Sequence, residues 1–300
     1  MRDTCCEAIE YKNYNLKFLQ QQMIEAAPVI IFFAVSMFMF IWALGNRELW
    51  TTEARWAEVV REMFLTGDFF HPTINGEPYF DKPLFGYWLI ALTSIITGNL
   101  NEWAVRIPSA FFGLISLYAT IFIGSRLWSK DVGKAAGWIL LTTHGVFFWA
   151  RTGQADIENL AAIIICLAWY VARRNKLNFI TFFVFYLIAF LGAQTKGLTA
   201  VVVPILFMIP DMLRERRWKI LFSLNHLIAL CGGLAFYFAP FIYSAMTAEQ
   251  GHQLNGIALL FRENIQRYFQ PFDHIEPYYV YFYYLPLFFC HGALCLSLGF

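Results

Sequence analysis

The chain has 300 residues, of which 59% are hydrophobic and only 14% charged, and its formal net charge is +1. Together with a mean hydropathy of +0.51, this composition lies outside the range of soluble domains and predicts a polytopic membrane protein. No basic stripe stands apart from the apolar segments, so nucleic acid is not expected as a partner.

The apolar segments predict eight membrane-spanning helices, because one span needs about 20 mostly apolar residues. Residues 1–25 are expected to form a cytoplasmic tail. The first span, at about 26–45, lacks a small-residue cleavage site and is expected to be an anchor rather than a signal peptide. The remaining spans are expected at about 105–127, 134–150, 157–172, 178–194, 198–213, 219–246 and 281–300. The expected fold class is therefore all-α, with residues 26–300 in one transmembrane domain.

Every second connection between these segments is basic, which predicts its side of the membrane, because Lys and Arg accumulate in cytoplasmic loops. With the N-terminus inside, the cytoplasmic connections contain Arg126, Lys130, Lys134, Arg173, Arg174, Lys176, Arg214, Arg216, Arg217 and Lys219. Counting the apolar stretch 84–97 as a span would place these residues outside, so that stretch is expected to lie along the interface or to dip into it. Four extracytoplasmic segments are then expected to meet: the loops 46–104 and 247–280 and the turns 151–156 and 194–197.

The first long loop contains an amphipathic pattern that predicts a helix lying on the bilayer surface. Its apolar positions are Trp56, Val59, Val60, Met63 and Phe64. Thr52 is the expected N-cap, and Glu53 in the first turn would complement the helix dipole. This structural role and a catalytic role for Glu53 both remain open.

Charged residues at a membrane surface are functional candidates, because an ionised group at bilayer depth costs on the order of 3 kcal/mol. Asp81 and Lys82 lie in an aromatic-rich turn, and Asp156 and Lys196 lie in the two short turns on the same predicted side. They could form interfacial salt bridges only. As a set they predict a polar cavity in which cations hold a lipid phosphate, a carboxylate acts as general base and aromatic rings stack on a sugar. This chemistry indicates lipid-linked glycosyl transfer, and no Walker-type or GxGxxG loop supports nucleotide use.

An ordered set of motifs carries a family resemblance. From about Leu49 onward the chain contains EARWAEVVREM, TGDFFHPTINGEPYFDKPLFGYW, AVRIPSA, ARTGQAD, TKG, RENIQRYF and a His-x-x-Pro at His274. In this order they resemble the bacterial GT-C membrane glycosyltransferases related to protein O-mannosyltransferases and to the lipid A aminoarabinose transferase. The resemblance implies a transmembrane helix bundle in the inner membrane. It also implies inverting transfer of a sugar from a polyprenyl phosphate to a lipid or protein acceptor on the periplasmic face.

The resemblance also assigns roles to residues of this chain. Tyr79 and Lys82 match the donor-phosphate-binding Tyr and Lys, and Lys196 matches the Lys of the TKG turn. Asp156 matches the second acidic position of the family. Glu53 and Arg55 match the Glu-x-Arg that opens the interfacial helix. Arg55 and, in the second long loop, Glu263 and Arg267 are further candidates for substrate binding.

Two departures from the family pattern keep alternatives open. Relatives usually have an Asp where this chain has Thr52, so the base is expected to be Glu53, the nearby Glu48 or Asp156. Asn264 stands where some relatives have a His that binds metal, so a divalent metal is only an option, with Asp81 and His274 as its candidate ligands.

The hypothesis from sequence is that Lys82, Lys196 and Arg267 neutralise the polyprenyl phosphate leaving group, while Glu53 or Asp156 acts on the acceptor. A transporter or lipid flippase is the rival function; it predicts broken helices in paired repeats, and no internal repeat is visible. Relatives are usually longer and this chain stops inside an apolar run, so it is expected to be the N-terminal part of a longer protein. An inactive remnant is the third option. Neither the sugar nor the acceptor can be identified from the sequence.

Overall fold

The structure is a computed structural model that describes residues 27–247, 256–262 and 277–280 and the single positions 266, 282, 284 and 286. It divides into two compact units, one ending at Trp42 and the other beginning at Ala43. The described helix of the first unit is Ala27–Ile41. All elements that follow in the chain belong to the second unit.

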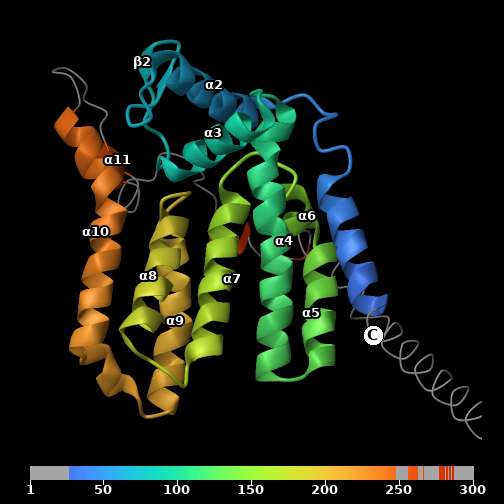
Figure 1. The fold of residues 1–300 in the computed structure, drawn as a ribbon, viewed down its shortest axis with the longest axis vertical. Coiled ribbons are helices and arrows are strands. Elements are labelled where there is room, and N and C mark those ends of the chain that lie inside the picture. The colour runs from blue at the N-terminus through green and yellow to red at the C-terminus, as the bar shows by residue number, and fades with distance from the viewer. Residues whose placement is uncertain are drawn as a thin grey trace, which may run out of the picture. The chain divides into compact units, whose positions relative to one another are not determined.

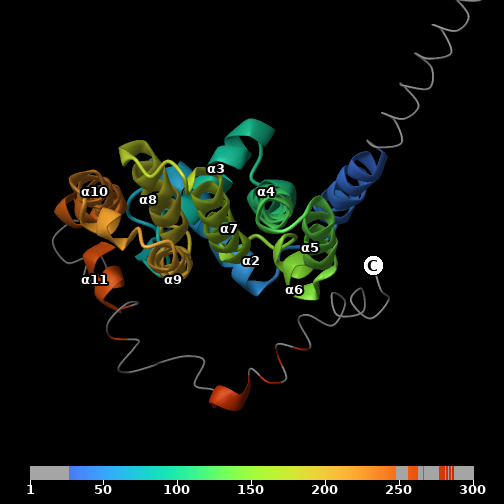
Figure 2. The ribbon, with the colours of Figure 1, turned by 90° about the horizontal axis from the view of Figure 1, so that it is seen from below.

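The second unit is almost entirely helical. Figure 1 shows its long helices side by side: α4 (Glu102–Leu127), α5 (Lys130–Thr142), α7 (Asp156–Arg173), α8 (Phe179–Ala193), α9 (Thr199–Arg214) and α10 (Leu224–Thr247). Seen along the helices in Figure 2, α7 lies between α4 on one side and α8 and α9 on the other, and all three pack against it. Helix α10 packs against α8.

The helices coincide with the predicted apolar segments, with two breaks. The segment 134–150 is divided into α5 and α6 (His144–Trp149), because Thr143 adopts an extended conformation with ψ 118°. The segment 219–246 begins with the 3-10 helix η1 (Trp218–Phe222), and α10 starts only after Ser223. The predicted last span, 281–300, lies outside the described residues except for isolated positions.

Two helices of the described chain, α4 and α10, are long and apolar enough by themselves to cross a membrane. Helix α3 (Phe85–Thr97) is apolar but short. At a rise of about 1.5 Å per residue it reaches about two thirds of the hydrocarbon thickness.

Helix α2 (Thr51–Thr66) corresponds to the predicted amphipathic helix, but it begins earlier and faces the protein. Trp50 is the N-cap, so the expectation that Thr52 caps the helix was wrong. Trp56, Val59, Val60 and Met63 are buried against the core, and the ring of Trp56 lies 4.5 Å from that of Tyr87 on α3. Phe64 is exposed. Most of the apolar face therefore packs against the protein core.

A short hairpin departs from the predicted all-α class. Strand β1 (Thr73–Ile74) pairs antiparallel with β2 (Glu77–Pro78). Asn75 and Gly76 between them both have positive φ, 54° and 76°. An Asn-Gly pair favours this two-residue turn because both positions need left-handed backbone.

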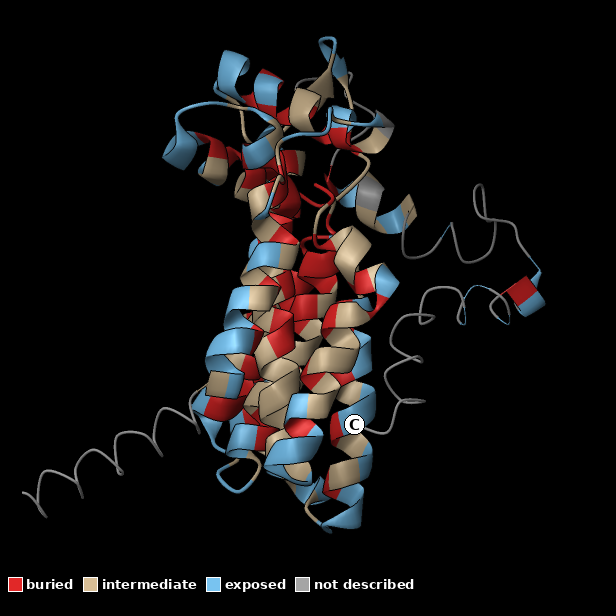
Figure 3. Ribbon diagram, turned by 90° about the vertical axis from the view of Figure 1, so that its right-hand side faces the viewer, coloured by how far each residue is buried: buried red, intermediate tan, exposed pale blue. Residues whose placement is uncertain are grey.

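Burial follows the contact surfaces of the helices, and exposed residues lie on their outer faces, as Figure 3 shows. Many of the exposed residues have large apolar side chains. Among them, Ile180, Leu206 and Leu224 are more than half exposed. Exposed apolar surface spread over a bundle is typical of a lipid-facing protein. The end of the bundle that adjoins α2 and α3 is named the site end. The opposite end, formed by the connections α4–α5, α7–α8 and α9–η1, is named the basic end.

Candidate active site

Glu53 lies at the centre of a buried ion-pair network at the site end. Its side chain is fully buried, and the Arg106 guanidinium donates to both of its carboxylate oxygens at 2.8 Å, from Nε and from Nη2. The Gly153 N–H donates at 2.8 Å and Arg47 Nη2 at 3.0 Å. Through Arg106 and Gly153, this one carboxylate ties α2 to α4 and to the turn 151–156.

The same contacts keep Glu53 ionised. Burial acts to raise the pKa of Glu53, but the hydrogen bonds from Arg106 and Gly153 and the charges of Arg106 and Arg47 outweigh it, so the pKa lies below its usual range. An ionised carboxylate that is fully buried and accepts several hydrogen bonds has little capacity to take a proton from an acceptor. Of the two roles that the sequence leaves open for Glu53, the geometry favours the structural one.

Asp156 and Lys196 form a second ion pair, which is accessible. Asp156 is the first residue of α7, and Lys196 follows the end of α8; Lys196 Nζ donates to Asp156 Oδ1. The side chain of Asp156 is 24% exposed and that of Lys196 is 46% exposed, and Lys196 Nζ lies 6.0 Å from the centre of the Trp149 ring. Unlike Glu53, this carboxylate can meet a substrate.

The turn with Lys82 adjoins the turn with Lys196. The Phe85 N–H donates to the Gln194 carbonyl at 3.2 Å, which fixes the start of α3 against the end of α8. Lys82 Nζ lies 3.4 Å from Asp81 Oδ2, and Arg262 Nη2 lies 3.3 Å from Asp81 Oδ1. The loop after α10, which contains Arg262, therefore reaches the same place.

Aromatic hydroxyls flank this turn. Arg55 Nη1 donates to the Tyr79 hydroxyl at 3.1 Å. Burial raises the pKa of the Tyr87 hydroxyl, and the neighbouring Asp81 and Tyr79 raise it further. Tyr87 therefore stays protonated and can act only as a neutral hydrogen-bonding group.

The predicted meeting of four segments is observed. Glu53 contacts Gly153, Phe85 contacts Gln194, and Arg262 contacts Asp81, so the loop 46–104, both short turns and part of the loop 247–280 converge at the site end. Of the predicted site residues, Glu53, Arg55, Tyr79, Asp81, Lys82, Asp156 and Lys196 lie in these segments. Glu263, Arg267 and His274 lie outside the described residues.

Within the described part of the chain, the surroundings of Asp81 do not fit a metal ion. Its two carboxylate oxygens face the cations Lys82 and Arg262. Among the residues that the structure describes, no three His, Cys, Asp or Glu side chains come together as a ligand set. A divalent cation needs several oxygen or nitrogen ligands, and Asp81 with two cationic neighbours does not supply them.

Sequence reasoning missed several residues of the site. Arg106 occurs in the AVRIPSA motif, and its position at the start of a predicted span was a signal, because a charge there is expensive unless it has a function. Arg262 was overlooked, and the neighbouring Glu263 and Arg267 were predicted in its place. Glu158 is buried and accepts a hydrogen bond from Ser109 Oγ at 2.8 Å, while its other carboxylate oxygen has no partner within the described part of the chain.

The chain is similar to bacterial arabinosyl transferases. It is 29% identical over 211 residues to the undecaprenyl phosphate-alpha-4-amino-4-deoxy-L-arabinose arabinosyl transferase of Pseudomonas aeruginosa (strain LESB58); the match covers 67% of this chain and 37% of that protein. It is 32% identical over 190 residues to the transferase of the same name from Enterobacter sp. (strain 638), with 60% and 34% covered. The chain thus spans little more than a third of the length of these relatives.

The fold is similar to that of ArnT from Cupriavidus metallidurans. The apo crystal structure matches with a TM-score of 0.67 and 22% identity, over 90% of this chain and 49% of that chain. The crystal structure bound to undecaprenyl phosphate matches with a TM-score of 0.66 and the same identity and coverage. These matches confirm the expected GT-C helix-bundle fold.

A family model also matches the segment from the Asp81-Lys82 turn to the last turns of α10. It covers residues 81–243, which is more than half of the chain, and it includes Lys82, Asp156 and Lys196. The chain therefore belongs to the family described as dolichyl-phosphate-mannose-protein mannosyltransferase.

Proposed function

We propose that this chain is the membrane-embedded part of a glycosyltransferase that takes a sugar from a polyprenyl phosphate. The observation that carries the proposal is the cationic site on two adjoining turns. Lys82 and Lys196 flank a backbone hydrogen bond between Phe85 and Gln194, and Asp156 lies beside Lys196. Three cations, Lys82, Lys196 and Arg262, lie beside two carboxylates, Asp81 and Asp156, and this excess of positive charge is suited to a substrate that brings its own phosphate. The names of the arabinosyl transferases and of the ArnT complex with undecaprenyl phosphate support a lipid-linked donor.

The proposed setting is a bacterial inner membrane, with the site end at the periplasmic face and the eight segments predicted from sequence as spans. Helices α2 and α3 would lie at the interface. The supporting observations are the exposed apolar side chains on the bundle and the clustering of three basic connections at its other end. This orientation agrees with the accumulation of Lys and Arg on the cytoplasmic side.

In the proposed reaction, the donor phosphate competes with Asp156 for Lys196. The lysine side chain is nearly half exposed, so it can turn from the carboxylate to the phosphate, with Lys82 on the adjoining turn as the second cation. The two ammonium groups neutralise the charge that grows on the phosphate as the glycosidic bond breaks. Asp156, released from its ion pair, accepts the proton of the acceptor hydroxyl. Direct attack by that hydroxyl inverts the anomeric centre. The acceptor is a lipid such as lipid A, or a protein hydroxyl.

Replacing Lys82 with Ala tests the donor site. The variant is made in the full-length protein and assayed in its native membranes. Transfer of radiolabelled sugar from a polyprenyl phosphate should fall at least about 100-fold, while the abundance of the protein stays unchanged. Lys134→Ala is the matched control, because Lys134 is exposed at the basic end and pairs only with Asp131 among the described residues. Full transfer by the Lys82→Ala variant would refute the donor site. Full transfer by an Asp156→Asn variant would refute the assigned base.

A further inference from the structure

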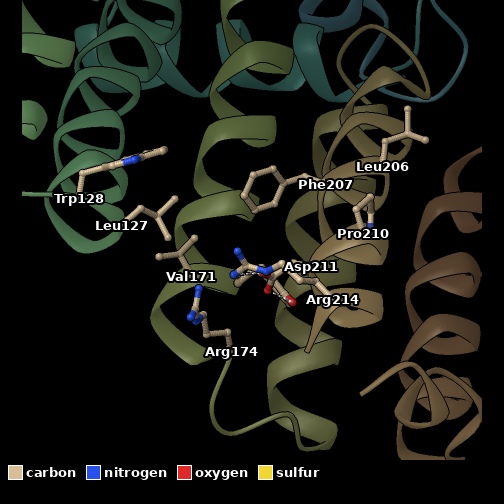
Figure 4. A pocket seen from close by; sticks show the side chains of 10 residues that line it. Leu127, Trp128, Val171, Arg174, Leu206, Phe207, Pro210, Asp211 and Arg214 are labelled. Carbon is tan, nitrogen blue, oxygen red and sulfur yellow. Dashed lines mark hydrogen bonds and ion pairs between the residues drawn. The ribbon is translucent and has the colours of Figure 1, made fainter. Parts of the chain in front are cut away.

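Two adjoining cavities lie at the basic end, far along the helices from the proposed donor site. The larger, of about 560 Å³, is formed between α4, α7 and α9, and Figure 4 shows Arg174 and Arg214 at its polar side and Leu206 and Phe207 at its apolar side. The smaller, of about 350 Å³, includes Arg126. Both are lined by Leu127, Val171 and Arg174, so Arg174 stands where the two cavities meet.

The positive charge of these cavities is not balanced by the protein. Asp211 is the acidic residue in their lining, and it already accepts a hydrogen bond from the Tyr170 hydroxyl at 2.8 Å and pairs with Arg214 at 3.5 Å. Glu215, outside the lining, also pairs with Arg214, at 3.4 Å. Arg126 and Arg174 form no ion pair with an acidic side chain in the part of the chain that the structure describes. With Glu215 counted, three arginines stand against two acids, and Arg126 and Arg174 still give the lining a net positive charge that is complementary to an anion.

The apolar wall of the larger cavity leads onto the outer surface of the bundle. Leu206 is 65% exposed, Phe207 42% and Trp128 71%. Exposed Trp next to Arg at a helix end is typical of the headgroup level of a membrane, where aromatic belts form. A molecule that fills this cavity therefore meets an apolar surface on one side and guanidinium groups on the other.

We propose that these cavities bind an anionic phospholipid of the cytoplasmic leaflet. Arg174 and Arg126 bind its phosphate, since the planar guanidinium matches phosphate geometry, and an acyl chain lies along Leu206 and Phe207. Basic pockets between membrane helices on this side are suited to anionic headgroups. The inference rests on the proposed membrane placement but not on the proposed reaction, because the site is at the opposite end of the bundle from Lys82 and Lys196.

Lipid binding to variants of the whole chain in nanodiscs tests the proposal. The probe is spin-labelled phosphatidylglycerol in a phosphatidylcholine background, and the signal is the motionally restricted fraction. Arg174→Gln should weaken the association about fivefold, the effect of one cation close to a phosphate. Arg173→Gln is the matched control: Arg173 is the preceding residue on α7, lies over the Trp169 ring at 5.0 Å and lines neither cavity. It should leave the association unchanged.

Two further measurements distinguish lipid binding at this site from binding to an apolar groove or to the donor site. Labelled phosphatidylcholine should show no difference between the Arg174→Gln variant and the parent protein; an equal loss would mean that the cavity is only an apolar groove and would overturn the proposal. The Lys82→Ala variant should bind phosphatidylglycerol as strongly as the parent protein does. Weaker binding by this variant would mean that the lipid occupies the donor site instead. Equal effects of Arg173→Gln and Arg174→Gln would likewise overturn it, because general surface charge would then suffice.

Discussion

Arg106 is a single buried side chain that organises the site end. Besides Glu53, its guanidinium donates to the carbonyls of Leu44 and Arg47 at 2.8 and 2.7 Å and to that of Glu48 at 3.0 Å. A buried charge is unfavourable unless it is paired and its remaining donors are satisfied, and here both conditions hold. The ion pair with Glu53 and these hydrogen bonds therefore offset the cost of burying Arg106, and they fix the segment that leads into α2.

Replacing Glu53 with Gln should destabilise the folded protein by about 3 kcal/mol, because it leaves the Arg106 charge buried without its counter-charge. The measurement is the thermal unfolding midpoint of the detergent-solubilised protein. Glu58→Gln on the same helix is the matched control: Glu58 forms an exposed ion pair with Arg61, and exposed pairs contribute little. Equal shifts in the two variants would show that the Glu53–Arg106 pair has no special role.

The difference between the Gln variant and the parent should also depend on pH. Because the pKa of Glu53 is lower in the folded than in the unfolded state, its stabilisation is complete at neutral pH and is lost as the pH falls through the lowered value. Gln does not titrate, so the two unfolding midpoints should converge on acidification. If the difference between the two midpoints stayed constant down to the lowest pH at which the protein folds, the assigned role of the Glu53 charge would be contradicted.

At this scale the sequence was informative about which residues gather but not about which pair. Asp156, Lys196 and Lys82 were predicted to be close because charge is expensive near a membrane. The choice between Glu53 as capping acid and Glu53 as base depended on Arg106 and Gly153, which lie 53 and 100 positions away in sequence. Long-range partners of this kind have no local sequence pattern. The burial and the ion pair of the Glu53 carboxylate could therefore be seen only in the structure.

The glycine pair of α10 shows how helices approach one another. A Cβ added at Gly233 would lie 2.7 Å from a ring carbon of Phe190 and 2.8 Å from the Tyr186 Cβ, both on α8. At Gly232 the nearest atom would be a Phe183 ring carbon at 3.3 Å. Of the two, only Gly233 requires the absence of a side chain for the α8–α10 contact.

Gly233→Ala should therefore destabilise the bundle, whereas Gly232→Ala should be neutral or stabilising. Both substitutions gain about 1 kcal/mol of intrinsic helix preference, so the difference between them isolates the packing clash, roughly 1–3 kcal/mol. Thermal unfolding midpoints of the two variants provide the measurement. A lower midpoint for Gly232→Ala than for Gly233→Ala would contradict the described α8–α10 packing.

At the scale of elements, hydropathy predicted the positions of α4 and α7 to α10 well, since apolar length is a property of the local sequence. Hydropathy failed to predict two local features, a break within an apolar segment and a β-hairpin. Thr143 ends α5 within the polar stretch from Thr142 to Gly145, and the Asn75-Gly76 turn makes a hairpin in a loop. Both signals, the Asn-Gly pair and the Thr-Thr-His-Gly interruption, were present in the sequence and were overlooked.

For the whole molecule, the two ends of the bundle are predicted to face opposite sides of a membrane. Single cysteines at Glu77 and Lys134, both exposed, should report this in a background without the native cysteines. A membrane-impermeant maleimide added to spheroplasts should label the cysteine at position 77. It should reach position 134 only after permeabilisation. Labelling of both without permeabilisation, or in the reverse pattern, would refute the proposed orientation.

The network around Glu53 also constrains the order of assembly during synthesis. The carbonyls of Leu44, Arg47 and Glu48 and the carboxylate of Glu53 precede Arg106 in the chain, and Gly153 follows about fifty residues later. The segment between the first helix and α2 is thus complete long before its partners leave the ribosome. It acquires its final position only when α4, and then the turn before α7, has been inserted.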